Sequence, residues 1–131
     1  MEDRPYEQIR VSVAEGVCRV ALHRPERKNA MGPQMVNELL YALDDAKDDA
    51  DVRVIVITGE GVAFCSGGDL KQMSSGGDGP TLEPKGTYSD LLLRFSGLGK
   101  PTIARVNGVA MGGGLGLVAG CDFAIACESA K

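Results

Sequence analysis

Residues 52–59, Val-Arg-Val-Ile-Val-Ile-Thr-Gly, decide the fold of this chain. Their nearly continuous apolar side chains, closed by a glycine, are typical of a strand that is covered on both faces of a sheet. Before this run, apolar residues recur at spacings of three and four between Met35 and Ala46, which predicts an amphipathic helix. A second apolar run follows at residues 102–106. Strands that alternate with helices predict an α/β fold.

The segments around this centre fit the same fold class. Apolar residues alternate with polar ones over residues 9–13, and a second strand is expected over residues 17–22, so that Glu15-Gly16 forms the turn of a hairpin. The end of the predicted helix is acidic, with five aspartates over residues 44–51, and we interpret them as a solvated face with no function.

Composition excludes several classes of protein. The chain has 131 residues, which favours one domain, and it lacks the run of ~18 apolar residues that a membrane span requires. A net charge of −4 and an aromatic content of 5% argue against a nucleic-acid partner. The four cysteines form no Cys-x-x-Cys pair and there is one histidine, so no metal site is expected. The N-terminus lacks the apolar core of a signal peptide, which favours the cytoplasm.

Two glycine-bearing segments, residues 64–70 and 108–116, each follow a predicted buried strand and lead into a predicted helix. A helix N-terminus presents unpaired backbone N–H groups, and glycine lets a ligand approach them closely. Two such loops facing each other would form a two-donor site for an oxyanion. The alternative is close strand-to-helix packing, which also requires small residues.

A weaker pattern lies in residues 114–119, Gly-Leu-Gly-Leu-Val-Ala, which match the loose dinucleotide fingerprint G-x-G-x-x-[GA]. The acid that would bind the ribose is expected about 20 residues further on, beyond Lys131. A Rossmann-type dinucleotide binder therefore stays as an alternative.

Several motifs together resemble the crotonase (enoyl-CoA hydratase/isomerase) family, specifically the N-terminal half of its subunit. They occur in the family's order, and His23 stands where the family usually has asparagine. The motifs are residues 22–31 (Leu-His-Arg-Pro-Glu-Arg-Lys-Asn-Ala-Met), 54–59, 64–70 (Phe-Cys-Ser-Gly-Gly-Asp-Leu), 100–104 with the glycine segment that follows, and the pair Cys121-Asp122. The resemblance implies a crotonase/ClpP-like α/β superhelix of ββα units, present in part. Residues 1–131 would then be one truncated domain that binds a CoA thioester.

The resemblance also implies site residues. Family members hold the thioester carbonyl oxygen with two backbone N–H groups, and the matching residues are Gly68 and Gly113. Each well-placed donor can stabilise the transition state by roughly 3–4 kcal/mol. The basic residues Arg24, Lys28 and Lys71 match the region that holds CoA phosphates, although an ordinary solvated surface explains them equally well. The further substrate contacts that the resemblance implies are Ala30, Ser66, Gly67, Asp69, Leu70, Gly112 and Gly116.

The departures from the family pattern concern the acids. Family hydratases carry a glutamate three residues after the second oxyanion glycine, where this chain has Gly116. The second hydratase glutamate would lie near position 136, so neither catalytic carboxylate is present. Asp69, Asp122 and Glu128 are interpreted as structural rather than catalytic. The Gly-Leu-Gly-Leu pattern is similar to that of branched-chain, methylglutaconyl-type hydratases.

Two functions thus stay open beside the dinucleotide alternative. The first is hydration or isomerisation of an enoyl-CoA by the full-length parent, expected to be a homotrimer or hexamer with no cofactor beyond the CoA of its substrate. The second is a non-catalytic domain that binds CoA esters. Residues 1–131 alone are expected to be inactive.

Overall fold

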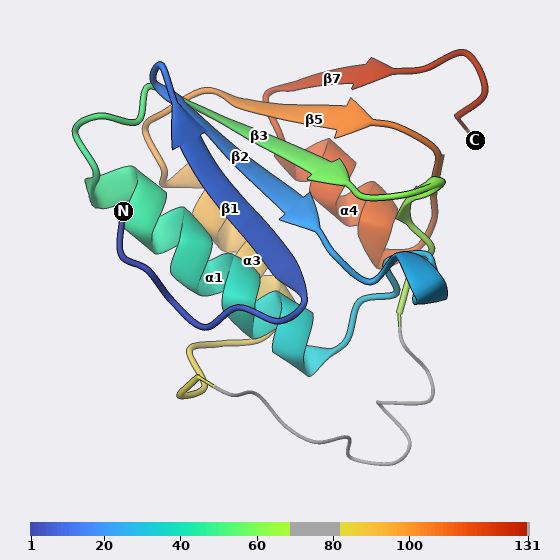
Figure 1. Cartoon of the computed structure of the whole chain (residues 1–131), viewed down its shortest axis with the longest axis horizontal. Coiled ribbons are helices and arrows are strands. Elements are labelled where there is room, and N and C mark those ends of the chain that lie inside the picture. Colours follow the sequence, from blue (N-terminus) through green and yellow to red (C-terminus); the bar gives the residue numbers. More distant parts are fainter. Residues whose placement is uncertain (69–81, 131) are drawn as a thin grey trace.

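The apolar run that dominates the sequence forms a strand at the centre of a five-stranded sheet in a computed structural model, which describes residues 1–68 and 82–130 (Figure 1). The strand order is β1-β2-β3-β5-β7; β1 and β2 are antiparallel, and the other neighbours are parallel. The strands are β1 (Ile9–Ala14), β2 (Val17–Leu22), β3 (Val54–Gly59), β5 (Thr102–Val106) and β7 (Phe123–Ala126). The predicted α/β class and the predicted hairpin are both confirmed.

The hairpin turn has the geometry that its two residues favour. Glu15 has φ of +52° and Gly16 has φ of +83°. Positive φ at both central residues is the mark of a turn whose twist matches that of the flanking strands.

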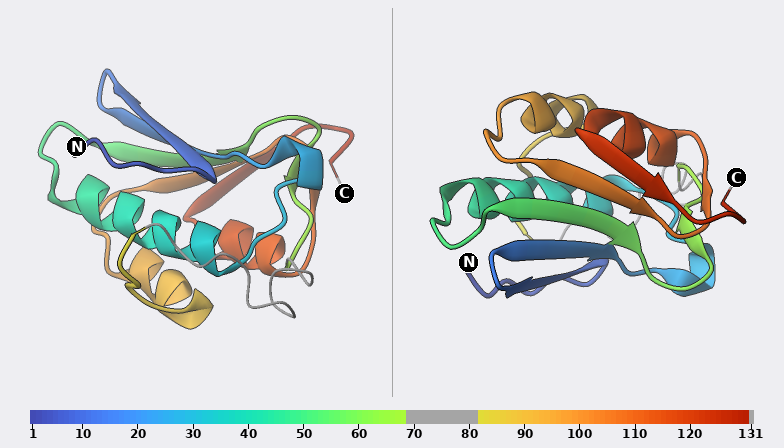
Figure 2. Two further views of the ribbon diagram at one scale, coloured as in Figure 1. Left: turned by 60° about the horizontal axis from the view of Figure 1, so that its bottom comes forward. Right: turned by 90° about the horizontal axis from the view of Figure 1, so that it is seen from above.

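Helices cover one face of the sheet (Figure 2). They are α1 (Pro33–Asp48), α3 (Tyr88–Ser96) and α4 (Gly113–Gly120), and a 3-10 turn, η1 (Pro25–Arg27), follows β2. Pro33 opens α1, where its missing N–H costs nothing. Two short parallel strands, β4 (Ala63–Cys65) and β6 (Val109–Ala110), pair apart from the main sheet and lead to the two glycine segments.

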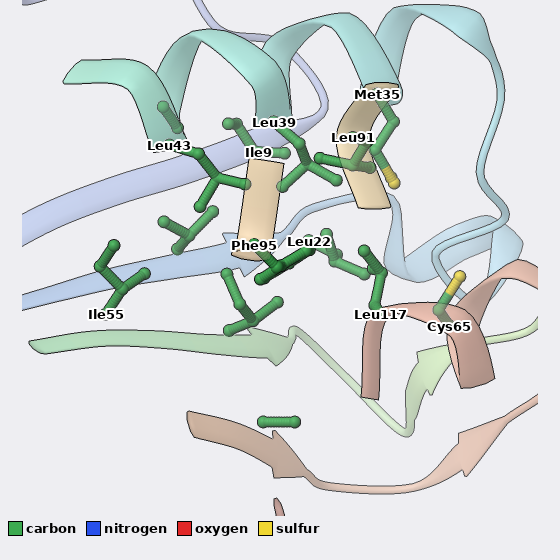
Figure 3. Close-up of a cluster of buried hydrophobic side chains, with 14 of the residues drawn as sticks. Ile9, Leu22, Met35, Leu39, Leu43, Ile55, Cys65, Leu91, Phe95 and Leu117 are labelled. Atoms are coloured by element: carbon green, nitrogen blue, oxygen red, sulfur yellow. The ribbon is translucent and has the colours of Figure 1, made fainter. Parts of the chain in front are cut away.

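The core lies between the helices and the sheet (Figure 3). Each of the three helices contributes side chains that meet the inner face of β2 and β3, where Leu22 and Ile55 are buried. These side chains are Leu39 and Leu43 of α1, Leu91 and Phe95 of α3, and Leu117 of α4. Because α3 and α4 share this core, their packing fixes the position of α4, whose first turn belongs to the second glycine segment.

The aspartates at the C-terminal end of α1 are not simply a solvated face, which corrects the sequence interpretation. Asp44 accepts hydrogen bonds from Arg94 and pairs with Lys85, at 2.9 and 2.8 Å. Asp45 pairs with Arg4 at 2.6 Å, and Asp49 pairs with the N-terminal ammonium group at 2.7 Å. These aspartates therefore connect α1 to α3 and to the N-terminal segment.

Among the residues that the structure describes, no helix combines the length and the apolar character needed to cross a membrane. The same residues hold no group of three or more His, Cys, Asp or Glu side chains that could bind a metal ion.

Candidate functional site

One cavity of about 470 Å³ is lined by both glycines that the sequence singled out, Gly68 and Gly113. The loop after β4 supplies Gly68, and the first turn of α4 supplies Gly113. The start of α1 and the residues that open α3 complete the wall. The lining residues are Met31, Gly32, Pro33, Val36, Gly68, Gly86, Thr87, Tyr88 and Gly113.

The two glycine segments touch each other directly. The Met111 N–H donates to the Cys65 carbonyl at 3.0 Å. A Cβ on Gly67, whose φ is +114°, would lie 3.3 Å from the Met111 carbonyl oxygen. A Cβ on Gly114 would lie 2.6 Å from the Cys65 carbonyl oxygen. Close packing, the alternative explanation of these glycines, is therefore real, and it also brings the two candidate donors to one cavity.

Neither candidate amide has a protein acceptor among residues 1–68 and 82–130. Gly113 is the first residue of α4, and its N-cap, Gly112, offers no side chain to the helix. The first N–H groups of a helix have no partner inside the helix. The bridge between Met31 and Gly68 uses the Gly67 carbonyl, which accepts from the Met31 N–H at 2.7 Å. In this described part of the chain, neither the Gly68 nor the Gly113 N–H donates to another protein group.

The loop over residues 24–30 lies against the Gly68 segment. The Ser66 N–H donates to the Lys28 carbonyl at 3.0 Å. The Lys28 side chain is exposed, whereas Arg24 is half-buried and donates from Nη1 to the Ala30 carbonyl at 3.1 Å. The structure thus brings Arg24, Lys28 and Ala30 beside Ser66 and the oxyanion candidates. The predicted contacts Asp69, Leu70 and Lys71 lie outside the described residues.

Asn29, which the sequence analysis quoted but gave no role, holds this loop. It is fully buried and has φ of +56°, a conformation that asparagine tolerates better than most residues. Its Nδ2 lies within hydrogen-bonding distance of three backbone carbonyls, those of Glu60, Ala63 and Phe64, at 3.0, 2.9 and 3.2 Å. Its Oδ1 accepts from the Arg24 N–H at 2.8 Å.

Tyr88 is the site residue that sequence reasoning missed. Its hydroxyl donates to the Gly113 carbonyl at 2.7 Å. A Cβ on Gly116 would collide with the same hydroxyl oxygen. Burial, and to a smaller degree the nearby Cys65, raise the pKa of Tyr88 above its ordinary value, so the phenol is neutral at pH 7. Only the pairing of α3 with α4 reveals this contact, and no local pattern encodes that pairing.

Two sets of hydrogen bonds place Tyr88. Thr87 caps α3 in a capping box with Asp90, whose carboxylate accepts from the Thr87 N–H at 2.7 Å. Asn37 of α1 accepts from the Lys85 N–H at 2.7 Å and donates to the Glu83 carbonyl at 3.1 Å. The segment that leads into α3 is therefore fixed on α1.

A helix-covered sheet with two adjoining glycine segments at one cavity is the arrangement that the resemblance to the crotonase family implies. The sequence profile of the Enoyl-CoA hydratase/isomerase family matches residues 12–131. The chain belongs to this family, which confirms the resemblance seen in its motifs.

Solved structures agree with this assignment. An enoyl-CoA hydratase/isomerase from Xanthobacter autotrophicus Py2 is 38% identical with a TM-score of 0.81, over 95% of this chain and 48% of that chain. An enoyl-CoA hydratase from Bacillus anthracis is 33% identical with a TM-score of 0.83, over 95% of this chain and 49% of that chain. The chain therefore spans about half the length of these relatives, which fits the expected partial fold.

Proposed function

We propose that this chain binds an acyl-CoA thioester, with the carbonyl oxygen held between the N–H groups of Gly68 and Gly113. The observation that carries the proposal is the single cavity that both glycines line. The reaction served by this site is hydration or isomerisation of an enoyl-CoA, in keeping with the family. The Gly-Leu-Gly-Leu sequence of residues 114–117 favours a branched acyl group.

The chemistry needs this arrangement because negative charge builds on the thioester oxygen as an enolate forms. Two fixed N–H donors stabilise that charge more than they stabilise the neutral carbonyl, and each contributes roughly 3–4 kcal/mol. The apolar side chains of Met31, Pro33 and Val36 supply a wall suited to an acyl chain.

The loop beside the glycines suits the CoA moiety. Arg24 and Lys28 lie on it, and together with Lys71 they would bind CoA phosphates through charge-assisted hydrogen bonds. Close contact with the thioester would fall to Ala30, Ser66, Gly67, Asp69, Leu70 and Gly112. Gly116, which the resemblance also implied as a contact, faces Tyr88 and Leu92 of α3 instead. We further propose that no cofactor takes part beyond the CoA of the substrate, and that the full-length parent is a cytoplasmic trimer or hexamer.

A second candidate, binding of a CoA ester without chemistry, is favoured by one observation. The cavity-lining residues in the described part of the chain include no carboxylate. The dinucleotide alternative has lost its support, because residues 114–119 lie inside α4 rather than in a strand-to-helix turn.

Two substitutions at Gly113 test the oxyanion assignment. Gly113→Pro deletes the N–H at a helix position that tolerates proline. Gly113→Ala keeps the N–H, and its Cβ would make an ordinary 3.6 Å contact with the Tyr88 ring. The measurement is the infrared carbonyl band of bound crotonyl-CoA. On binding, we expect the band of crotonyl-CoA to move to lower frequency in the unsubstituted protein and in Gly113→Ala, and to move much less in Gly113→Pro. An equal movement in all three proteins would refute the assignment.

A further inference from the structure

One face of α4 is built from glycines, and α3 packs into it. Gly113, Gly116 and Gly120 recur at spacings of three and four, so they share a face of the helix. A Cβ on Gly113 or Gly116 would meet Tyr88 of α3, and a Cβ on Gly120 would meet Phe95. Figure 2 shows the two helices side by side on the same face of the sheet. Gly116 thus points at α3, and the Tyr88 hydroxyl already fills the space of any side chain there.

The first turn of α4 has little intrinsic support. The whole helix spans Gly113–Gly120, and four of these eight residues are glycines. Glycine is the poorest helix former after proline. The N-cap residue is also a glycine, so no side chain caps the helix. An external hydrogen bond to this turn therefore matters more than it would in an ordinary helix, and the Tyr88 hydroxyl makes one to the Gly113 carbonyl.

The same geometry argues against proton transfer by Tyr88 itself. Its proton is already donated to the Gly113 carbonyl, and the phenol is neutral at pH 7, since burial raises its pKa further above an ordinary value that is already well above 7. A neutral phenol with an engaged proton is a poor general base. Its effect has to pass through Gly113.

We propose that Tyr88 is a positioning residue of the oxyanion hole. It fixes the first turn of α4 so that the Gly113 N–H points at the thioester oxygen, and it excludes any side chain at residue 116. This inference rests on the proposed function, because it assigns a role within the same site.

The test compares two tyrosines that each donate a hydrogen bond to a backbone carbonyl. Tyr88→Phe removes the hydroxyl and keeps the ring. Tyr41→Phe is the matched control: the Tyr41 hydroxyl donates to the Glu83 carbonyl at 2.9 Å, this carbonyl keeps its bond from Asn37 at 3.1 Å, and Tyr41 does not line the cavity. The first readout needs no ligand: amide hydrogen exchange at Leu115 and Gly116, whose N–H groups donate to the Gly112 carbonyl at 3.0 and 3.3 Å. The second readout is the carbonyl band of bound crotonyl-CoA.

We expect Tyr88→Phe to accelerate exchange at both amides several-fold and to shrink the ligand-induced band shift, while Tyr41→Phe changes neither. Unchanged exchange in Tyr88→Phe overturns the inference without reference to any ligand. Faster exchange with a full band shift also overturns it, since the hydroxyl then serves stability alone. If the unsubstituted chain itself shows no band shift, the proposed function fails and the positioning role falls with it.

Discussion

Asn29 is the buried residue of the loop over residues 24–30 and determines the position of that loop. Replacing it with alanine removes a donor to the carbonyls of Glu60, Ala63 and Phe64 and the acceptor of the Arg24 N–H, although the Ala63 carbonyl keeps a bond from Asn107. Each buried group left without a partner costs about 1–3 kcal/mol. We therefore expect Asn29→Ala to lower the free energy of unfolding by about 2–4 kcal/mol in urea titrations. A loss below about 0.5 kcal/mol, the range of neutral surface changes, would contradict this account.

Gly116 illustrates a residue whose identity is set by its neighbour. Gly116→Ala places a methyl group against the Tyr88 hydroxyl and should destabilise the chain by about 1–3 kcal/mol. In a Tyr88→Ala background the clash is gone, and alanine should be better than glycine by up to about 1 kcal/mol as a helix former. Urea unfolding of the unsubstituted protein, the two single variants and the double variant gives the coupling free energy between residues 88 and 116.

The control for this cycle is Gly97→Ala. A Cβ there would lie 3.9 Å from the Arg94 carbonyl oxygen, an ordinary contact, so little change is expected. Additive effects of the changes at residues 88 and 116 would mean that the two residues do not share the space.

At the scale of elements, Asp44 ties α1 to α3. Burial alone would raise the pKa of Asp44, but hydrogen bonds from Arg94 and Lys85 outweigh it and hold the pKa below its ordinary value. A carboxyl whose pKa is depressed by folding stabilises the fold above its unfolded pKa, and this contribution is lost as the pH falls through the folded value.

We predict that the difference in free energy of unfolding between the unsubstituted protein, called the parent in this comparison, and Asp44→Asn depends on pH. The parent should be the more stable protein at pH 7, and the difference should shrink as the pH falls below about 4. Urea unfolding at several pH values measures it. A difference that is constant across this range would show that the ion pairs contribute nothing through charge.

Periodic elements were predictable because their signals are local. The apolar run of β3, the helical spacing of α1 and the Glu15-Gly16 turn each specify their structure within a few residues. The two glycine segments were also predictable as a pair, because each follows a strand. Tyr88 was not, because its role depends on how α3 packs against α4, and two short helices carry no local record of that contact. The aspartates at the end of α1 were misinterpreted for the same reason: their partners lie in other elements.

At the scale of the whole molecule, lysines should contribute to the affinity for CoA, which carries phosphates, and not to the affinity for a pantetheine thioester. Lys28→Gln combined with Lys71→Gln should weaken CoA binding and reduce its dependence on salt, because fewer phosphate contacts remain to be screened. Affinity for a pantetheine thioester, which lacks the nucleotide phosphates, should change little. Lys47→Gln, an exposed lysine near the end of α1, is the control. Calorimetric titration measures the affinities; equal losses for both ligands would mean that the lysines act on the fold.

The last prediction concerns a polypeptide of residues 1–131. It should bind crotonyl-CoA but not hydrate it at an enzymatic rate. Adding water needs a base for the water proton and an acid for the α-carbon, each contributing typically 10²–10⁴-fold. Gly116 supplies neither, the described cavity-lining residues include no carboxylate, and the family's second glutamate is expected near position 136. The oxyanion donors alone would polarise the carbonyl without moving a proton. Loss of the ultraviolet band of the conjugated thioester measures turnover. Robust turnover that disappears in Asp69→Asn or Glu128→Gln would show that the chemistry belongs to acids interpreted here as structural.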